Sequence, residues 1–480
     1  MDITRLLLIA TGLVTLLGLG AFSLTSVREG ERRAARVAAG LAIALSLPFF
    51  LAPLFPTPVR LALLGIVAVA IASGMILFLL PIGRIERGND VPQTRIDERD
   101  IMFARAKLEP GTPDYEAYYA RRPENKAGDD KSRSLPGLLS PDASQANPLV
   151  FAATDAAFDL IGAMRDAVNG PVATDQTEHQ STAMTAYVKN LARYWGADTV
   201  GITELKPYHV YTHVGRGSGV YGAPITLEHQ TAIAFTVEMD HAMVGTSPAS
   251  PTCLETARQY ANAAQIAIQL GNFLRSQGYE ARAHIDGNYR VVAPLVARDA
   301  GLGEIGRMGL LMTPTLGPRV RLGVVTTDLP LVPDPRTDDP SVLDFCQVCK
   351  KCADTCPVRA IPAGDRQEID GALRWRINQD ICYRYWCVTG TDCARCMALC
   401  PYSYARSLPH NMVRWTVRRS GAARRAVLWL DRVFYGSDPA PKPAPAWVPN
   451  PPPPFEPKHR TQATWQAKPN RAQGAQHDTE

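Results

Sequence analysis

The feature that most constrains this chain is a pair of closely spaced cysteine runs between residues 346 and 401. The first run is Cys-x2-Cys-x2-Cys-x3-Cys-Pro and the second is Cys-x2-Cys-x3-Cys-Pro. With the two cysteines between them, these runs hold nine of the ten cysteines in the chain. Cysteines at three-residue steps present thiolates to one cubane, and the cysteine before each proline ligates the other cluster. The spacing predicts two [4Fe-4S] clusters and transfer of single electrons.

The same rule divides the thiolates between the two predicted clusters. One cluster is expected to be held by Cys346, Cys349, Cys352 and Cys400. The other is expected to be held by one further upstream cysteine together with Cys356, Cys393 and Cys396. Both Cys382 and Cys387 are candidates for that last place, and spacing alone leaves the choice open.

Two other uses of cysteine fit this pattern poorly. Zinc sites favour paired Cys-x2-Cys knuckles separated by longer loops, whereas the first run has three cysteines at consecutive three-residue steps. Disulfides concentrate in small secreted domains, whereas this chain has 480 residues. The remaining cysteine, Cys253, stands apart from the runs and is expected to be a buried thiol.

The N-terminal residues 1–83 predict three transmembrane helices. Runs of about 20 apolar residues are long enough to cross hydrocarbon as helices, and they occur at Leu6–Val27, Val37–Phe55 and Val59–Leu80. The link between the first two runs is basic, with arginines at Arg28, Arg32, Arg33 and Arg36. By the positive-inside rule, we expect a multi-pass protein of the inner membrane with everything after residue 83 on the cytoplasmic side.

Composition divides the remainder of the chain into further segments. Residues 84–147 are polar but contain aromatic side chains, which favours an arm wrapped on the main domain over a free linker. Residues 148–340 interleave helical runs with short apolar strands and predict an α/β or α+β domain. Residues 341–406 form the cluster domain, 407–436 a basic amphipathic segment, and 437–480 a proline-rich tail that we expect to be disordered.

Within residues 148–340, helices are expected at Leu149–Val168, Thr182–Tyr194 and Leu254–Gln277, and strands at Gln230–Glu238 and Val320–Thr326. A Gly-x-Gly-x-x-Gly match at residues 217–222 is followed by Pro224 and a strand-like run, so we interpret it as a hairpin and not as a dinucleotide site.

The net charge of +5 is mild, and no basic stripe with interleaved aromatics indicates nucleic-acid binding. The segment 407–436 is suited either to anionic lipid headgroups or to the edge of a domain.

A set of motifs upstream of the cysteines identifies the main domain. They are Gly278–His284 with Tyr289, then Ala300–Gly309, Thr313–Leu322 and Thr327–Leu331, joined to Phe345–Ala353. Together they resemble the corrinoid iron-sulfur reductive dehalogenases over about residues 95–401. Epoxyqueuosine reductases share the Ala-Gly-Leu-Gly core and both cysteine runs, but they lack the membrane spans and the N-terminal arm.

The resemblance implies a nitroreductase-like α/β core that holds base-off cobalamin, with the two clusters supplying electrons to the cobalt. The chain has no Asp-x-His-x-x-Gly motif that would provide a lower histidine ligand, which agrees with the base-off form. The protein then supplies position, electrons and a proton to chemistry that belongs to the cofactor. Electrons are expected from an external donor such as a ferredoxin, a flavodoxin or a membrane component.

Reductive cleavage of a carbon–halogen bond consumes two electrons and one proton. The resemblance implies that a tyrosine just upstream of the Ala-Gly-Leu-Gly motif donates the proton beside a lysine or arginine near the first cluster run. Tyr289 matches the first position, and Lys351, or alternatively Lys350, matches the second. The family also favours Cys382 over Cys387 as the eighth ligand, because its cysteine precedes an aromatic-rich turn. A core tyrosine and a solvated lysine pair are the ordinary alternatives.

The cofactor site is expected to use residues of the same motifs. The glycines suggest close backbone approach to the corrin ring, at Gly301, Gly303, Gly306 and Gly309. Three arginines could clamp corrinoid propionamides or a substrate anion, namely Arg307, Arg319 and Arg321. Tight turns and structural ion pairs are the alternative roles.

Three functions of different classes follow. The first is a membrane-anchored reductive dehalogenase acting on an organohalide, with a haloaromatic expected by analogy. The second is a corrinoid reductase of the epoxyqueuosine type, and the third is a non-catalytic membrane electron-transfer subunit. Cobalamin content separates the third from the others, and halide release separates the first from the second.

Overall fold

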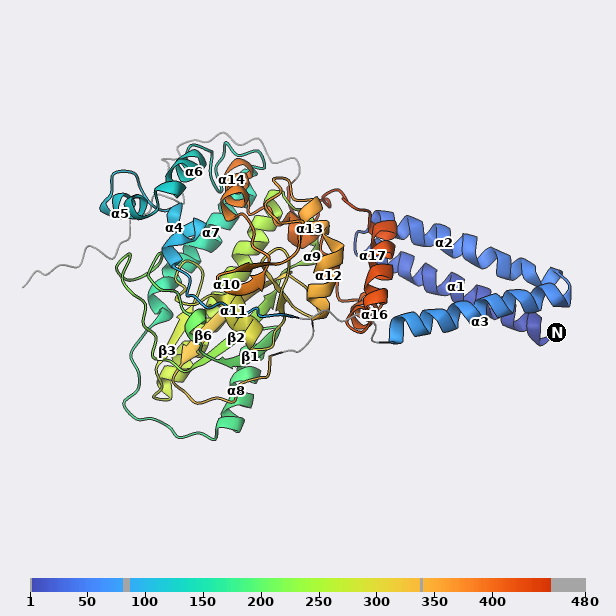
Figure 1. The fold of residues 1–480 in the computed structure, drawn as a ribbon, viewed down its shortest axis with the longest axis horizontal. Helices are drawn as coiled ribbons and strands as arrows, with labels where there is room; N and C mark the ends of the chain where they lie inside the picture. Colours follow the sequence, from blue (N-terminus) through green and yellow to red (C-terminus); the bar gives the residue numbers. More distant parts are fainter. Residues whose placement is uncertain (1, 81–86, 337–339, 450–480) are drawn as a thin grey trace, which may run out of the picture.

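The structure is a computed structural model, and it describes residues 2–80, 87–336 and 340–449. Three long helices project from one side of a mixed α and β domain (Figure 1). They are α1 (Ile3–Arg28), α2 (Arg32–Leu51) and α3 (Thr57–Leu79). By length and composition all three are able to cross a membrane, as the sequence predicts.

The arginine-rich turn between α1 and α2 lies beside the main domain. The α1–α2 turn lies at the domain end of the bundle (Figure 1). In that turn Glu29 contacts His410 at 2.8 Å, and Arg33 donates to the backbone oxygen of Val433. The arginine-rich turn and the main domain therefore lie at the same end of the three helices.

The arm predicted for residues 84–147 packs against the domain. It contains α4 (Met102–Arg105), α5 (Pro113–Arg121) and α6 (Pro123–Arg133). A buried ion pair of 2.6 Å joins Arg105 to Asp129, and Met102 packs with Tyr383 of the cluster domain. The aromatic residues that favoured an arm are buried, and they include Tyr115, Tyr118 and Tyr119.

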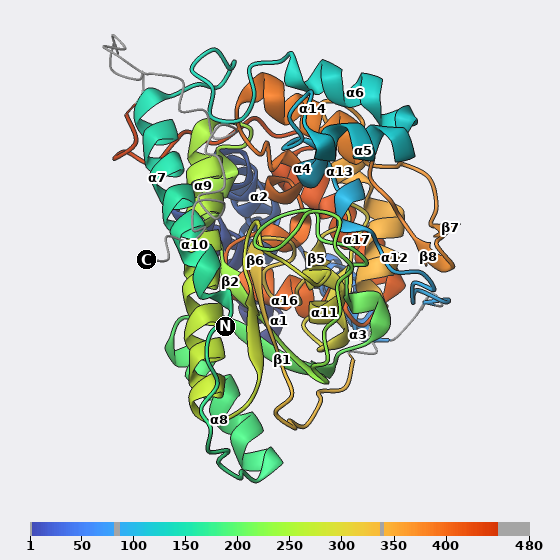
Figure 2. The ribbon, with the colours of Figure 1, turned by 90° about the vertical axis from the view of Figure 1, so that its left-hand side faces the viewer.

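A four-stranded antiparallel sheet forms the centre of the main domain. Its order is β1 (Thr199–Glu204), β2 (Thr231–Glu238), β6 (Val320–Thr327) and β3 (Ala281–His284). One face is covered by the long helix α10 (Ser250–Ser276), which lies beside α7 (Pro148–Met164) in Figure 2. The short helix α11 (Ala293–Asp299) packs on the sheet from the other side. The expected strands, helices and α+β class are confirmed.

Both faces of the sheet are buried, and in β2 every residue except Glu238 is buried. In β2, Ile233 and Phe235 contact the α10 side, whereas Ala232 and Ala234 contact the α11 side. Phe235 lies opposite Gly323 of β6, where an added Cβ would come within 2.2 Å of the ring. Any larger residue at Gly323 would displace that ring from the core.

Short elements complete the domain. Upstream of the cluster region they are α8 (Ser181–Tyr194), α9 (His241–Gly245), β4 (Glu304–Ile305) and β5 (Leu311–Met312). Within and after it they are α12 (Ser341–Cys349), α13 (Lys351–Asp354), β7 (Gln367–Ile369), β8 (Ala372–Arg374), α14 (Gln379–Thr389), α15 (Arg395–Ala398), α16 (Leu408–Val417) and α17 (Gly421–Tyr435).

The sequence predicts a hairpin at the glycine-rich residues 217–222 and disorder in the proline-rich tail from residue 437. The glycine-rich stretch is a turn in which Gly217, Gly219 and Gly222 all have positive φ, with no helix of the dinucleotide type following it. In the proline-rich tail, residues 437–449 pack on the domain, where Val448 is buried and Lys442 pairs with Glu31. The rest of the predicted disordered tail, from residue 450, lies outside the described residues.

Candidate functional site

The first set of predicted cluster cysteines lies together around the α12–α13 turn. Lys350 adopts a left-handed conformation between the two helices, so the chain reverses between Cys349 and Cys352. Burial raises the pKa of the Cys400 thiol, and the neighbouring Cys346, Cys349 and Cys352 raise it further. Four cysteines from two separate runs therefore lie in one buried cluster.

The second set gathers in the same way. Burial raises the pKa of Cys396, and so do Cys393, Cys382 and Cys356 around it. Cys387 instead lies one helical turn further along α14, packed with Met102 and hydrogen-bonded to Tyr383. The structure thus brings Cys382, and not Cys387, to the second set.

All ten cysteines are unpaired, so no disulfide competes for these thiols. In the parts of the chain that the structure describes, no three His, Cys, Asp or Glu side chains converge on a position for a single metal ion.

The second cysteine set borders a cavity of about 330 Å³ between the cluster region and the main domain. Its wall includes Cys356, Cys382, Cys393 and Cys396, together with apolar side chains such as Met308, Leu310 and Ile377. Cys253, expected to be a buried thiol, is buried and also lines this cavity. Mostly apolar cavities with a few polar groups are the usual form of cofactor and substrate sites.

One tyrosine of the cavity wall has a cation against its ring. Tyr260 projects from α10, and the Arg321 guanidinium lies 4.9 Å from its ring centroid. Burial raises the pKa of Tyr260, whereas Arg321 lowers it. A phenol in this setting remains protonated at neutral pH and has a cation ready to stabilise its phenolate.

Arg321 is held in place from two other directions. It donates to Thr256 at 2.7 Å and to Asp392, which directly precedes Cys393, at 3.1 Å. Among the described residues, its buried Nε atom and the buried Oδ1 atom of Asp392 have no hydrogen-bond partner. Such atoms are seldom left unsatisfied in a protein interior, so they are suited to a polar group of a bound molecule.

Besides Arg321 and Arg395, three cations line the cavity, namely Lys107, Arg165 and Arg216. They come from the end of α4, the end of α7 and the glycine-rich loop, which are distant in sequence. Desolvation by the surrounding protein lowers the pKa of Lys107 to about 8, although the residue keeps an exposed surface, and Arg165 and Arg216 lower it as well. With Asp286 also in the wall, these residues make one part of the cavity strongly charged.

The proton donor predicted from the sequence, Tyr289, lies beside Tyr260 and Asp286 of the cavity wall. Tyr289 packs in the cluster of α11 and β2 side chains and is not among the residues that line the cavity. Burial raises its pKa well above the usual range, and Arg216 is the cation that opposes this increase most strongly. The structure gives Tyr289 an arginine neighbour in place of the lysine we expected.

The two candidate lysines belong to the first cysteine set and not to the cavity wall. Lys350 forms the left-handed turn. Lys351 is buried between Cys349 and Cys352 and donates to Asp431 of α17 at 2.8 Å, with both side chains 4% exposed. Lys351 therefore joins the cluster region to the C-terminal helix.

The other predicted cofactor-binding arginines are committed to protein contacts. Arg307 is fully buried and donates to the backbone oxygens of Cys346, Pro362 and Gly364. Arg319 donates to the backbone oxygens of Ser403 and Met239. Of the three candidate arginines, Arg321 lines the cavity.

The candidate glycines shape the loop before the cluster region. At Gly303, where φ is 159°, an added Cβ would come within 2.2 Å of the backbone oxygen of Met312. At Gly306 it would meet the Met312 side chain at 2.7 Å. Gly301 and Gly309 take positive φ in turns, and Met308 and Leu310 beside them reach the cavity. Gly303 and Gly306 thus allow their backbone to approach Met312 closely.

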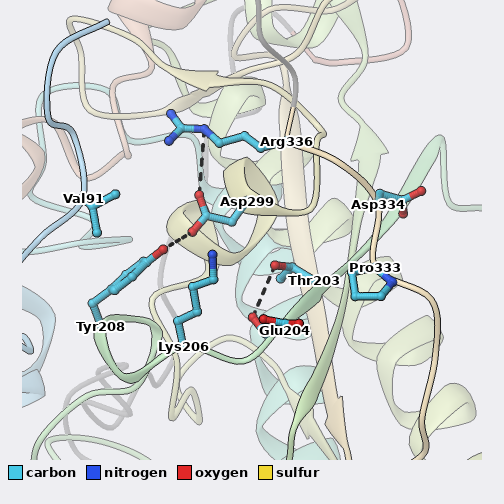
Figure 3. Close-up of a pocket in the computed structure, with 9 residues that line it drawn as sticks. All are labelled: Val91, Thr203, Glu204, Lys206, Tyr208, Asp299, Pro333, Asp334 and Arg336. Atoms are coloured by element: carbon cyan, nitrogen blue, oxygen red, sulfur yellow. Dashed lines mark hydrogen bonds and ion pairs between the residues drawn. The ribbon is translucent and has the colours of Figure 1, made fainter.

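A smaller cavity of about 200 Å³ lies beside the end of β1 (Figure 3). Asp299 accepts hydrogen bonds there from Tyr208 at 2.6 Å, and it lies 4.0 Å from Arg336. Its polar groups are largely paired with one another, and it contains no cysteine or predicted site residue. We therefore place the functional site at the larger cavity.

The cysteine-rich region matches a known domain, and a longer part of the chain is similar in sequence to known enzymes. Residues 345–404 match the model of a 4Fe-4S dicluster domain. The chain is 32% identical over 307 residues to the tetrachloroethene reductive dehalogenase of Sulfurospirillum multivorans, covering 56% of this chain and 59% of that enzyme. The enzyme of the same name from Desulfitobacterium hafniense is 34% identical over 197 residues, 38% of this chain and 35% of the enzyme.

Solved structures extend the similarity to the fold. The catabolic reductive dehalogenase NpRdhA, determined with 3-bromo-4-hydroxybenzoic acid, superposes with a TM-score of 0.61 at 25% identity, covering 74% of this chain and 49% of that chain. The chain spans less than two thirds of the length of the curated relatives it matches. The shared sequence, fold and dicluster domain agree in identifying reductive dehalogenases as homologues of this chain.

Proposed function

We propose that this chain replaces a halogen with hydrogen on an organohalide, using two [4Fe-4S] clusters and a base-off corrinoid. One observation carries the proposal: a single cavity is lined both by four cysteines of the dicluster domain and by the Tyr260–Arg321 pair. Electrons from a cluster and a proton from a phenol can therefore be delivered to the same bound molecule.

The cysteine sets support the division of cluster ligands made above. Cys346, Cys349, Cys352 and Cys400 would hold the cluster further from the cavity. Cys356, Cys382, Cys393 and Cys396 would hold the cluster at its wall. Electrons would pass from the first to the second and then into the cavity.

The cavity also fits a corrinoid in its chemistry. Met308, Leu310 and Ile377 offer apolar surface for a macrocycle, and the unsatisfied atoms of Arg321 and Asp392 offer polar partners for peripheral groups. A corrinoid bound here would supply a reducible cobalt at which the carbon–halogen bond is broken.

The proton is proposed to come from Tyr260 instead of Tyr289. The overall reaction takes up two electrons and one proton, forms a carbon–hydrogen bond and releases a halide ion. Tyr260 lines the cavity, and Arg321 stabilises the phenolate that remains after the proton leaves. Tyr289, Lys350 and Lys351 do not line the cavity.

A haloaromatic carrying a phenolate or carboxylate is the substrate class we favour. Lys107, Arg165 and Arg216 line the cavity and would attract such an anion. The solved relative NpRdhA has 3-bromo-4-hydroxybenzoic acid bound, whereas the curated relatives are named for tetrachloroethene. The positively charged wall of the cavity favours an anionic haloaromatic over a chlorinated ethene.

Membrane anchoring through α1–α3 is part of the proposal. Their length and apolar composition support it, and the basic α1–α2 turn supports a cytoplasmic position for the domain by the positive-inside rule. Protease protection on inverted membrane vesicles tests the orientation, since the proposal predicts that the domain is digested.

A halide-release assay tests the activity. The full chain is loaded with cobalamin and reduced, and free halide is measured over bromophenols, halobenzoates and chlorinated ethenes. The proposal predicts release from the anionic haloaromatics. Bound cobalamin with no halide release from any organohalide would favour the epoxyqueuosine-type alternative, and absence of cobalamin binding would favour an electron-transfer subunit.

A further inference from the structure

The C-terminal helices α16 and α17 have two different faces. α17 lies across the domain ends of α1–α3 (Figure 1), and it contacts both α2 and α3. On its inner face, Val427 and Leu428 pack in the same cluster as the cysteines of the first set. Asp431 pairs with Lys351, and Arg424 pairs with Asp344 of α12. This face belongs to the cluster region.

The other face of α17 is turned toward the membrane helices. Phe434 packs edge-on against Phe22 of α1 with centroids 5.2 Å apart, and the backbone oxygen of Val433 accepts from Arg33 of α2. Leu430 lies one helical turn before Phe434, and Trp429 lies one turn before Val433, on the same sides of α17. Trp429 is 64% exposed although it is large and apolar.

Helix α16 continues the same surface. Ser420, at its junction with α17, donates to the backbone oxygen of Leu77 in α3 at 2.8 Å. Its exposed apolar side chains include Met412 and Trp415, and the Arg419 guanidinium lies 4.0 Å from the Trp415 ring. Exposed tryptophans beside arginines are typical of helices at the interface of a bilayer.

The charge of this surface is strongly positive. Eight exposed arginines lie at the end of α1, in the first turns of α2, between α16 and α17, and on α17, at residues 28, 32, 33, 36, 418, 419, 425 and 432. The acidic residues of the α1–α2 turn, Glu29 and Glu31, pair with His410 and Lys442. A surface of this sign is complementary to anionic lipid headgroups.

We propose that α16 and α17 form a membrane seat, defined as residues 408–435, that inserts Trp415 and Trp429 into the interface and binds anionic headgroups through its arginines. The inference rests on the proposed insertion of α1–α3. Its consequence is that the cluster of Cys346, Cys349, Cys352 and Cys400 lies at the membrane side of the domain, where a donor in the membrane would reach it first.

Quenching of tryptophan fluorescence tests the insertion. The full chain is reconstituted in lipid nanodiscs whose lipids carry bromine near the top of the acyl chains. The double variant W415F/W429F is expected to lose most of the bromine-dependent quenching. W195F is the matched control, since Trp195 lies at the end of α8, away from the membrane helices, and it should retain that quenching. Equal quenching in W415F/W429F and wild type would overturn the proposal.

Hydrogen exchange tests the lipid charge. Amides of residues 421–435 are expected to exchange several-fold more slowly in discs containing phosphatidylglycerol than in discs of phosphatidylcholine. The triple variant R419Q/R425Q/R432Q should lose this difference, whereas R193Q/R258Q/R376Q, with the same change in charge on other surfaces, should keep it. No difference between the two lipids in wild type would overturn the headgroup part.

The two proposals can fail separately. If the chain does not elute with the nanodiscs, the anchoring by α1–α3 is wrong and the membrane seat falls with it. If the chain elutes with the discs but its seat tryptophans are not quenched, the anchoring stands and the membrane seat is wrong.

Discussion

Replacing Tyr260 with phenylalanine tests the proposed proton donor. The substitution removes one hydroxyl group and keeps the ring that packs against Arg321. A positioned general acid contributes about 10²–10⁴-fold to a rate, which corresponds to roughly 3–5 kcal/mol of transition-state stabilisation. Dehalogenation should slow by about that factor while the cluster and corrinoid spectra remain unchanged.

The contribution of Arg321 can be worked out from its position. At 4.9 Å from the ring centroid and an effective dielectric constant of about 20, a unit charge stabilises the phenolate by about 3 kcal/mol. Arg321→Gln should therefore slow proton transfer by about 10²-fold. Because burial raises the pKa of Tyr260, the alkaline limb of the wild-type pH profile should be flat through the neutral range.

Stopped-flow product formation with cobalamin-loaded protein is the assay. Tyr289→Phe is the matched control, since Tyr289 is another tyrosine near Arg216 and Asp286 but does not line the cavity. It should retain most of its activity. Full activity in Tyr260→Phe together with loss in Tyr289→Phe would show that Tyr289, the donor expected from the sequence, supplies the proton.

Three further predictions concern other parts of the account. Cys382→Ser should lose about half of the bound iron while Cys387→Ser keeps it, as measured by iron and sulfide content; equal loss in both would contradict the ligand division. Because the pKa of Lys107 is lowered to about 8, this side chain is cationic below pH 8 and neutral above it. The KM for a halobenzoate should therefore rise above pH 8. Lys107→Gln should abolish this pH dependence of KM, and the KM for a chlorinated ethene should not depend on pH in this way. Asp431→Asn leaves the buried Lys351 ammonium without its counter-charge and should cost about 3–5 kcal/mol of stability in thermal unfolding, whereas Asp438→Asn, an exposed partner of Arg395, should cost less than about 1 kcal/mol.

Features that depend on short stretches of sequence could be predicted. Three-residue cysteine steps, apolar runs long enough for a bilayer and short β-branched strands are local signals, and each was found where it was expected. The ends of α10 were predicted to within a few residues because Pro251 marks its start and Gly278 follows its end.

The proposed proton donor, Tyr260, could not be predicted because its setting depends on tertiary contacts. Arg307, Arg319 and Arg321 look alike in sequence, but Arg321 alone among them reaches Thr256 and Asp392, which are 65 and 71 residues away. The sequence signal for Tyr260 was faint: Thr256 lies one turn before it, but polar residues such as Glu255, Gln259 and Asn262 occur on other sides of the same helix.

The lysines show the same dependence on tertiary contacts. Their place between cluster cysteines suggested a role in catalysis, but Asp431, 80 residues downstream, is the partner of Lys351. A buried ammonium requires a counter-charge, so the sequence could have indicated that a distant acid was needed. It could not indicate which one.

Coupled measurement of halide and electrons tests whether the chain reduces a carbon–halogen bond. Cobalamin-loaded chain is given a known amount of a one-electron reductant and a bromophenol, and bromide, phenol and oxidised reductant are counted together. The account predicts one bromide and one phenol for every two electrons, with formation of both lost in Tyr260→Phe. Consumption of reductant without release of bromide would contradict it.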